Sequence, residues 1–200
     1  ARQQQMVRCD FETWPAEEVL LKHLGAFGRL LDETDVLVLS DYGKGGLSHI
    51  TKMIEAARAR KIPILVDPKG DDYARYAGAT VITPNRSELR EVVGRWRDEA
   101  DLTERAQNLR TSLGLEHLLL TRSEEGMTLY SASGQITVPA QAREVFDVSG
   151  AGDTVIAVLA ATLATGVPIE EAVAVANKAG GIVVGKLGTA TVSYDELFGN

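Results

Sequence analysis

Short apolar runs alternate with amphipathic stretches between residues 36 and 121 of this chain. The runs are continuous, which is typical of strands that are buried on both faces of a sheet. We expect four strands, at residues 36–40, 62–66, 80–83 and 118–121. Apolar side chains recur at helical spacing between them, at residues 50–57, 87–93 and 102–113. This alternation produces βαβ units, so the sequence predicts an α/β fold with a mostly parallel central sheet flanked by helices.

The pattern changes after residue 125. Residues 126–138 alternate between apolar and polar side chains and carry a turn at Ser133-Gly134, which predicts an antiparallel hairpin at one edge of the sheet. Two helices rich in Ala and Val follow, at about 151–166 and 169–185, and we expect both to be mostly buried. Gly166 is suited to end the first of them, and Pro168 is suited to begin the second.

Composition restricts the class of protein. The chain has 200 residues, of which 44% are hydrophobic, enough for one globular domain or most of a larger one. A net charge of −7 without a basic cluster argues against a nucleic-acid partner. Cys9 is the only cysteine, which excludes an intrachain disulfide and favours a reducing, cytoplasmic setting. The longest apolar run, residues 155–164, is too short to cross a bilayer, so we expect no membrane partner.

An acidic, glycine-rich turn stands immediately before the first of the two long helices. Residues 147–153 read Asp-Val-Ser-Gly-Ala-Gly-Asp. Small residues that lead into a helix expose backbone N–H groups, which together with the helix dipole suit an anion. The carboxylate of Asp153 would repel a phosphate unless it takes a proton, so the turn suits phosphoryl transfer to a hydroxyl. The alternative is an ordinary glycine-rich loop in which Asp153 caps the helix.

Polar residues follow each predicted core strand. They stand at residues 40–41, 67–69, 84–85 and 121–122. Ligands of open α/β sheets bind at the carboxyl ends of the strands. We therefore expect these segments to gather at one edge of the sheet and to form one site.

Three segments resemble the ribokinase/PfkB carbohydrate kinase family: the turn at 150–153, Asn-Arg-Ser-Glu at 85–88, and Thr-Arg-Ser-Glu-Glu-Gly at 121–126. The resemblance extends over nearly the whole chain and implies a Rossmann-like ribokinase fold. It also implies an enzyme that uses ATP and Mg²⁺. Within the family, residues 40–45, 66–70 and 183–189 resemble the kinases that phosphorylate D-glycero-β-D-manno-heptose 7-phosphate at O1, on the way to ADP-heptose for lipopolysaccharide.

Two alternatives stay open. The first is another sugar or nucleoside kinase of the same family. The second is a non-catalytic nucleotide-binding module. The presence of Asp153 together with Asn85 and Glu88 argues against the second, because binding alone requires no base.

The resemblance implies roles for individual residues of the turn. Asp153 is the general base that takes the proton of the acceptor hydroxyl. The amides of Gly150, Ala151 and Gly152 stabilise charge on the transferring phosphoryl group. The same glycines are also suited to a tight turn, and the two interpretations are compatible.

The resemblance also implies an ATP site and a magnesium site. Asn85 and Glu88 order water around Mg²⁺, and Arg86 and Ser87 belong to the same nucleotide segment. A helix-capping role for Asn85 or Ser87 is the alternative. The other residues implied to contact ATP are Thr121, Arg122, Gly126 and Asn177. Arg122 is equally suited to be a solvated surface side chain.

The sugar phosphate and a monovalent cation are implied to bind nearby. Lys44, Asp67, Lys69 and Arg8 lie on the sugar side, where cationic groups would hold the 7-phosphate. A solvated side chain is the alternative for each Lys and Arg among them. Asp147 and Ser149 resemble the K⁺ region of some family members.

Full-length members of the family begin with a further segment that carries the first strands, a Gly-Gly sugar-binding motif and most of a lid. We expect residues 1–200 to be the C-terminal portion of such a kinase domain, with the N-terminal strands and lid missing and residues 1–14 as a remnant of the lid or a strand. The isolated chain is then expected to be weak or inactive. A homodimer, and a fused nucleotidyltransferase domain in the parent protein, are left open.

Overall fold

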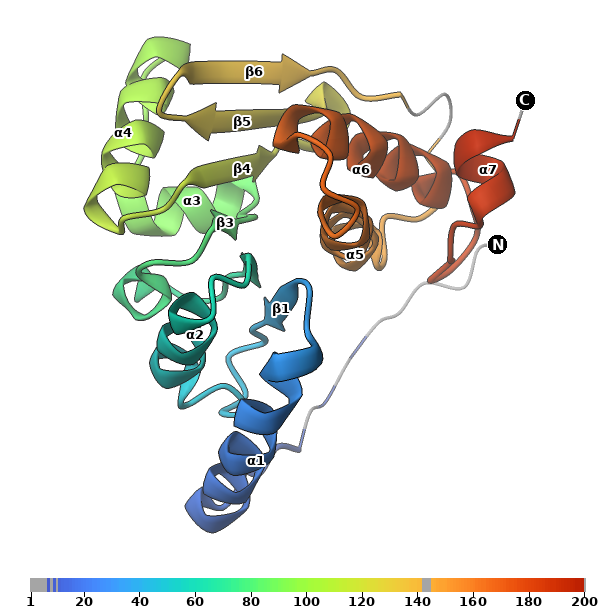
Figure 1. Cartoon of the computed structure of the whole chain (residues 1–200). Helices are drawn as coiled ribbons and strands as arrows, with labels where there is room; N and C mark the ends of the chain where they lie inside the picture. Colours follow the sequence, from blue (N-terminus) through green and yellow to red (C-terminus); the bar gives the residue numbers. More distant parts are fainter. Residues whose placement is uncertain (1–6, 8, 10, 142–144, 200) are drawn as a thin grey trace.

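Helices lie on both faces of one central sheet, which gives the chain three layers (Figure 1). The structure is a computed structural model that describes residues 7, 9, 11–141 and 145–199. Its helices are α1 (Glu17–Leu30), α2 (Ile50–Ala59), α3 (Arg86–Val93), α4 (Glu99–Ser112), α5 (Ala151–Leu163), α6 (Ile169–Val184) and α7 (Tyr194–Phe198). Its strands are β1 (Leu37–Ser40), β2 (Ile64–Asp67), β3 (Val81–Ile82), β4 (His117–Thr121), β5 (Met127–Ser131) and β6 (Gly134–Val138). Short 3₁₀ turns occur at Leu31–Glu33, Tyr73–Tyr76 and Ser123–Glu125.

The strands lie in the sheet in their order along the chain, from β1 to β6. Strands β1 to β4 pair in parallel, whereas β5 pairs antiparallel with both β4 and β6. The predicted parallel core and the predicted hairpin at the sheet edge are therefore confirmed. The hairpin pairs Ser131 with Gly134, so its two loop residues are Ala132 and Ser133, one position earlier than the predicted turn.

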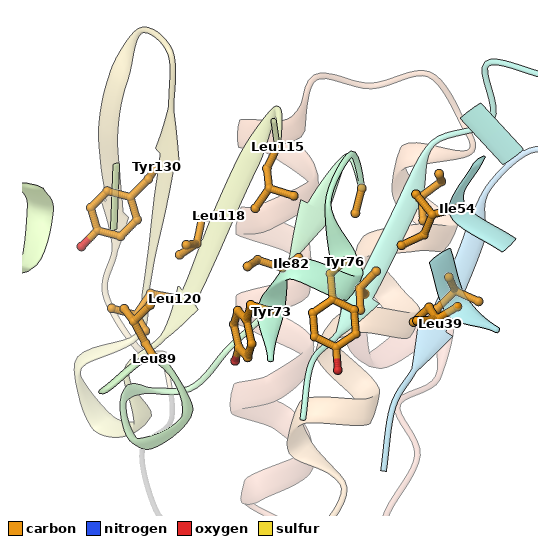
Figure 2. Close-up of a cluster of buried hydrophobic side chains, with 14 of the residues drawn as sticks. Leu39, Ile54, Tyr73, Tyr76, Ile82, Leu89, Leu115, Leu118, Leu120 and Tyr130 are labelled. Atoms are coloured by element: carbon orange, nitrogen blue, oxygen red, sulfur yellow. The ribbon is translucent and has the colours of Figure 1, made fainter. Parts of the chain in front are cut away.

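The core lies on both faces of the sheet. Leu118 and Leu120 of β4 pack with residues of α2, α3 and α4, whereas Leu119 packs with residues of α5 and α6. All three leucines are fully buried, because successive side chains of a strand point to opposite faces. Figure 2 shows the first of these clusters, with Leu118, Leu120 and Tyr130 among its labelled residues. Burial on both faces explains why the strands read as continuous apolar runs.

Helices α5 and α6 pack side by side on one face of the sheet (Figure 1). Gly180 of α6 allows the close approach, since a Cβ atom there would lie 3.1 Å from Cγ2 of Val155 on α5. The prediction of two adjacent helices is confirmed, but they are less buried than expected, since four of the 13 residues of α5 and seven of the 16 residues of α6 are buried. In the described part of the chain, no helix combines the length and apolar character that a membrane crossing requires.

Helix α1 is absent from the elements predicted above. None of its residues is buried, and Leu20, Leu24 and Phe27, which recur at helical spacing, are only half-buried. The described residues before α1, namely 7, 9 and 11–16, form no strand. Residues 1–6, 8 and 10 of the expected lid or strand remnant lie outside the described residues.

Candidate active site

The carboxyl ends of the parallel strands bring the predicted segments together. Ser40 at the end of β1 pairs with Asp67 at the end of β2, and the backbone N–H of Asp41 donates to the carbonyl of Asp67 at 2.9 Å. An isolated parallel bridge joins Asn85 to Thr121. The expected gathering of these segments along one sheet edge is confirmed.

Asp153 lies in the first turn of α5 and faces the loop after β1. The hydroxyl of Tyr42 in that loop donates to Oδ1 of Asp153 at 2.9 Å. The N-cap residue of α5 is Gly150, and no side chain caps this helix. The alternative in which Asp153 caps the helix is therefore wrong, and its carboxylate is available for other contacts. Both Tyr42 and Asp153 are exposed.

Tyr42 was not among the predicted site residues. The available signal was its position, because it stands in the turn directly after a core strand, at the edge where ligands of such sheets bind. Its contact with Asp153 spans 111 positions of the chain, which no local pattern reveals.

The turn before α5 is held by its own backbone. Gly150 adopts φ 77°, and a Cβ atom there would lie 2.9 Å from Cγ2 of Thr189, so both the conformation and the space favour glycine. The N–H of Ala151 donates to the carbonyl of Val148 at 3.2 Å. The amides of Gly152 and the residue after it lie in the first turn, where a helix offers no acceptor of its own. Free N–H groups at a helix N-terminus are the kind of donors that bind anions in other proteins.

Asp147 fixes the start of the same turn. Its Oδ1 accepts from the backbone N–H of Ser149 at 2.9 Å, and its own N–H donates to the carbonyl of Val184 at 3.3 Å. The hydrogen bond from Ser149 holds the pKa of the Asp147 carboxyl below its usual value. This carboxylate is charged at neutral pH and oriented by the turn.

Acidic groups gather beside Asp153. Burial, followed by the nearby charges of Glu88 and Asp153, raises the pKa of Asp67 to about 6. Lys69 opposes this shift, and its Nζ lies 3.1 Å from Oε1 of Glu88. The structure thus brings the predicted residues Asp67, Lys69 and Glu88 to one edge.

Asn85 and Glu88 form a capping box at the start of α3. Oδ1 of Asn85 accepts from the N–H groups of Ser87 at 2.8 Å and Glu88 at 3.0 Å, and Oε2 of Glu88 accepts from the N–H of Asn85 at 2.9 Å. The capping alternative is therefore present in the structure. Among the described residues, no group of three or more His, Cys, Asp or Glu side chains is placed to hold a metal ion.

Arg122 is buried rather than solvated. Its guanidinium makes two bonds to the carboxylate of Glu99, at 2.8 and 2.9 Å, and further bonds to Glu125. Glu125 also binds Arg86, whose guanidinium lies over the ring of Trp96. The charge of Arg122 is balanced by two carboxylates, which connect the loop after β4 to α4.

The other predicted ATP residues belong to β4, to the loop before β5 and to α6. Thr121 ends β4, and its N–H donates to the carbonyl of Pro84 at 3.0 Å. Gly126 has φ 97°, and a Cβ atom there would lie 2.1 Å from the carbonyl oxygen of Val138, so only glycine fits. Asn177 of α6 is buried, and its Nδ2 donates to the carbonyl of Pro139 at 2.8 Å.

The predicted cationic residues differ in their surroundings. Lys44 is exposed and pairs with Glu12 at 2.6 Å. Lys69 pairs with Glu88, as described above. Arg8 lies outside the described residues.

Comparison with known proteins identifies relatives of the whole chain. The model of the pfkB family of carbohydrate kinases matches residues 10–196. D-beta-D-heptose 7-phosphate kinase from Bordetella bronchiseptica is 54% identical over 99% of this chain and 63% of that protein. Bifunctional protein HldE from Methylococcus capsulatus is 52% identical over 98% of this chain and 42% of that protein. The chain thus spans less than two thirds of the length of these relatives.

Solved structures share the fold. Phosphofructokinase-2 from Escherichia coli, in complex with potassium, matches 92% of this chain and 61% of its own, with a TM-score of 0.77 and 21% identity. Ribokinase from Arabidopsis thaliana, complexed with ribose and ATP, matches 88% of this chain and 56% of its own, with a TM-score of 0.71 and 20% identity. The predicted ribokinase-like fold is confirmed. Because the family model covers nearly every residue, the chain belongs to the pfkB family of carbohydrate kinases.

Proposed function

We propose that the complete protein is an ATP-dependent kinase that phosphorylates D-glycero-β-D-manno-heptose 7-phosphate at O1, in the synthesis of ADP-heptose for lipopolysaccharide. The substrate is supported by identities of 52% and 54% to relatives named for this kinase and for bifunctional HldE. The chemistry is supported by one observation above the others: the uncapped first turn of α5 presents Asp153 beside backbone amides that have no acceptor in the helix.

The residues of the turn are suited to the phosphates of ATP. Neither Gly150 nor Gly152 adds a side chain to the turn, and a Cβ atom at Gly152 would meet nothing within 4 Å. We assign the amides of Gly150, Ala151 and Gly152 to the transferring phosphoryl group, where they would stabilise its developing charge. The hydrogen bond of Ala151 to Val148 is long, at 3.2 Å, and can be exchanged for one to phosphate.

The acidic edge is suited to Mg²⁺ held through water. Mg²⁺ usually keeps several of its waters, and the described residues offer no direct cluster of ligands. Asn85 and Glu88 would hold those waters, with the Oε1 atom of Glu88 on the side of Lys69. When bound, Mg²⁺ neutralises charge on the phosphates.

Asp153 is the base of the proposed reaction. One carboxylate oxygen of Asp153 takes the proton of the O1 hydroxyl while O1 of the sugar bonds to the γ-phosphorus. The bond between the γ-phosphorus and its bridging oxygen breaks, and the electron pair leaves with ADP. The products are the heptose 1,7-bisphosphate and ADP, and the proton stays on Asp153 until solvent removes it.

The remaining assignments follow the sheet edge. Arg86, Ser87, Thr121, Gly126 and Asn177 are proposed to border ATP. Arg122 is proposed to support the ATP site through the loop after β4, since Glu99 and Glu125 already balance its charge.

The sugar phosphate and K⁺ complete the proposed site. Asp67, Lys69, Lys44 and Arg8 are assigned to the sugar phosphate. Each lysine would leave its carboxylate partner and bind the 7-phosphate instead: Lys69 would leave Glu88, and Lys44 would leave Glu12. Asp147 and Ser149 are assigned to a K⁺ site, because the carboxylate of Asp147 is held ionised by the turn.

Two further features belong to the proposal for the complete protein. Relatives of which the chain covers only 42% are named bifunctional, which supports a second, fused nucleotidyltransferase domain. A homodimer is the proposed assembly, and the cytoplasm, where ATP is made, is the proposed location.

A panel of acceptors tests the substrate. The complete protein is supplied with ATP and Mg²⁺ and with the heptose 7-phosphate, ribose, fructose 6-phosphate or adenosine in turn. We expect turnover of the heptose 7-phosphate with kcat/KM at least about 100-fold above the others, since bound phosphate and hydroxyls contribute several kcal/mol. Preference for another acceptor would identify a different kinase of the family. ATP binding without turnover of any acceptor would favour a nucleotide-binding module.

A further inference from the structure

We propose that Tyr42 is a positioning residue for the base, and that its hydroxyl orients the carboxylate of Asp153 towards the acceptor. This inference rests on the proposed function, because it assigns Asp153 the role of base. It begins from the 2.9 Å hydrogen bond between the Tyr42 hydroxyl and Oδ1 of Asp153, which joins the loop after β1 to the first turn of α5.

The loop that carries Tyr42 is anchored on both sides of this residue. Asp41 is buried, and its Oδ1 accepts from the N–H of Gly43 at 2.8 Å. Its Oδ2 accepts from the buried hydroxyl of Tyr76 at 2.9 Å, and Arg75 approaches the same oxygen at 3.5 Å. The backbone on either side of Tyr42 is therefore tied to the core, which limits the directions in which its ring can point.

The ring of Tyr42 has no role in the core. Tyr42 is 61% exposed, in contrast to Tyr76 and Tyr130, which are fully buried. An exposed aromatic ring contributes little to stability through burial. The hydroxyl of Tyr42 lies near Ser40 of the preceding strand and donates to Asp153, which joins two segments of the site.

The surroundings of Asp153 explain why a neutral donor is useful there. The charged groups that face this edge are Asp67 at the end of β2, Glu88 on α3, and Lys69 in the loop after β2. Asp147 lies in the turn before α5, and Lys186 after α6 is paired with Glu196. Lys69 is paired with Glu88. A second cation placed beside Asp153 would compete with the acceptor hydroxyl for the carboxylate of Asp153. A phenol orients one oxygen without adding charge and leaves the other oxygen to take the proton.

The contact also affects Tyr42 itself. The hydrogen bond to Asp153 raises the pKa of the Tyr42 hydroxyl above its usual value, since the phenol must give up a proton that the carboxylate holds. The titration of this tyrosine is therefore a signal of the contact that requires no substrate.

Two measurements on the complete protein test the inference. In the first, kcat and KM are compared for the wild type, Tyr42→Phe and Tyr194→Phe. Tyr194 on α7 is also exposed, so its variant is a matched control for loss of a phenolic hydroxyl. We expect Tyr42→Phe to lower kcat about 10-fold, as loss of a hydrogen bond to a charged group does, with KM for ATP unchanged. Equal kcat values for the two variants would overturn the inference, as would a rise in KM for ATP with kcat unchanged.

In the second measurement, ¹³C NMR follows the titration of Tyr42 in the wild type and in Asp153→Asn. We expect the pKa of Tyr42 to fall towards its usual value in the variant, because the charged acceptor is gone. Identical titrations would overturn the inference even if no acceptor sugar were turned over. Failure of the proposed function would instead appear as a wild type that phosphorylates no acceptor while the titration still shifts.

Discussion

Nζ of Lys69 lies 3.1 Å from Oε1 of Glu88, which links the loop after β2 to the first turn of α3. The pair lies beside Asp67, and Glu88 contributes to the raised pKa of that carboxyl while Lys69 opposes it. The charge of Lys69 therefore acts on two carboxylates: it pairs with Glu88 and lowers the pKa of Asp67. An arriving sugar phosphate would meet a lysine that is already oriented by Glu88.

The raised pKa of Asp67 predicts a specific pH dependence of stability. The folded-state pKa of about 6 lies above the ordinary value of 3.8, so the folded protein keeps this proton to higher pH than the unfolded chain does. The resulting stability is fully present below about pH 4 and is lost as pH rises through about 6. Asp67→Asn removes this loss. We expect its free energy of unfolding, relative to the wild type, to increase between pH 4 and pH 7.

Urea unfolding at pH 4, 5, 6 and 7 measures that difference. Asp71→Asn, at an exposed position in the following loop, is the control, and its difference from the wild type should stay constant. If the Asp67→Asn curve runs parallel to that of the wild type over this range, the carboxyl is not perturbed as described.

Gly150→Ala is expected to destabilise the protein and to impair the turn. A residue with a side chain at φ 77° costs about 1–2 kcal/mol, and the added Cβ would meet Cγ2 of Thr189 at 2.9 Å. We expect the free energy of unfolding to fall by at least about 1 kcal/mol, and kcat to fall as the amides are displaced. Urea unfolding and steady-state kinetics measure the two effects.

Two further variants separate strain from contact. Gly25→Ala in α1 has open space around it and no positive φ, so it should be neutral or raise stability by about 0.5–1 kcal/mol. Thr189→Ser removes the Cγ2 atom and should restore part of the stability of Gly150→Ala. No loss of stability in Gly150→Ala would contradict the described turn.

Arg122→Met is expected to loosen the loop after β4 from α4. The substitution removes the bonds to Glu99 and Glu125 while keeping a long side chain, and we expect a loss of about 1–3 kcal/mol in the free energy of unfolding. Arg122→Lys should not restore it, because an ammonium group cannot make the same paired bonds to Glu99. Urea unfolding measures all three proteins, with Arg95→Met at an exposed position as the control. Equal stability of the lysine variant and the wild type would contradict this assignment.

The sheet could be predicted because its signals are local. Each parallel strand is short and buried on both faces, so its apolar run stands out, and the polar residues after β1, β2 and β4 mark the edge where they meet. The capping box of Asn85 and Glu88 can also be inferred from the sequence, since the two residues are three positions apart in one helical turn.

Other features depend on contacts between distant segments. Arg122 was expected to be solvated or to meet phosphate, because nothing in the sequence near it indicates that Glu99 of α4 lies opposite. Asn177 is predicted to contact ATP, whereas its hydrogen bond to the carbonyl of Pro139 follows from how α6 lies against the end of β6 and has no signal in the sequence. Helix α1 is a different case, because Leu20, Leu24 and Phe27 recur at helical spacing and its signal was present in the sequence.

The role of Asp153 is tested most directly by Asp153→Asn in the complete protein, with ATP affinity and phosphoryl transfer to the heptose 7-phosphate measured on the same sample. Asparagine keeps the shape of the side chain but cannot take the proton. We predict that kcat falls by about 10²–10⁴-fold while the Kd for ATP changes by less than about threefold. Near-normal turnover in the variant would contradict the assignment of Asp153 as the base.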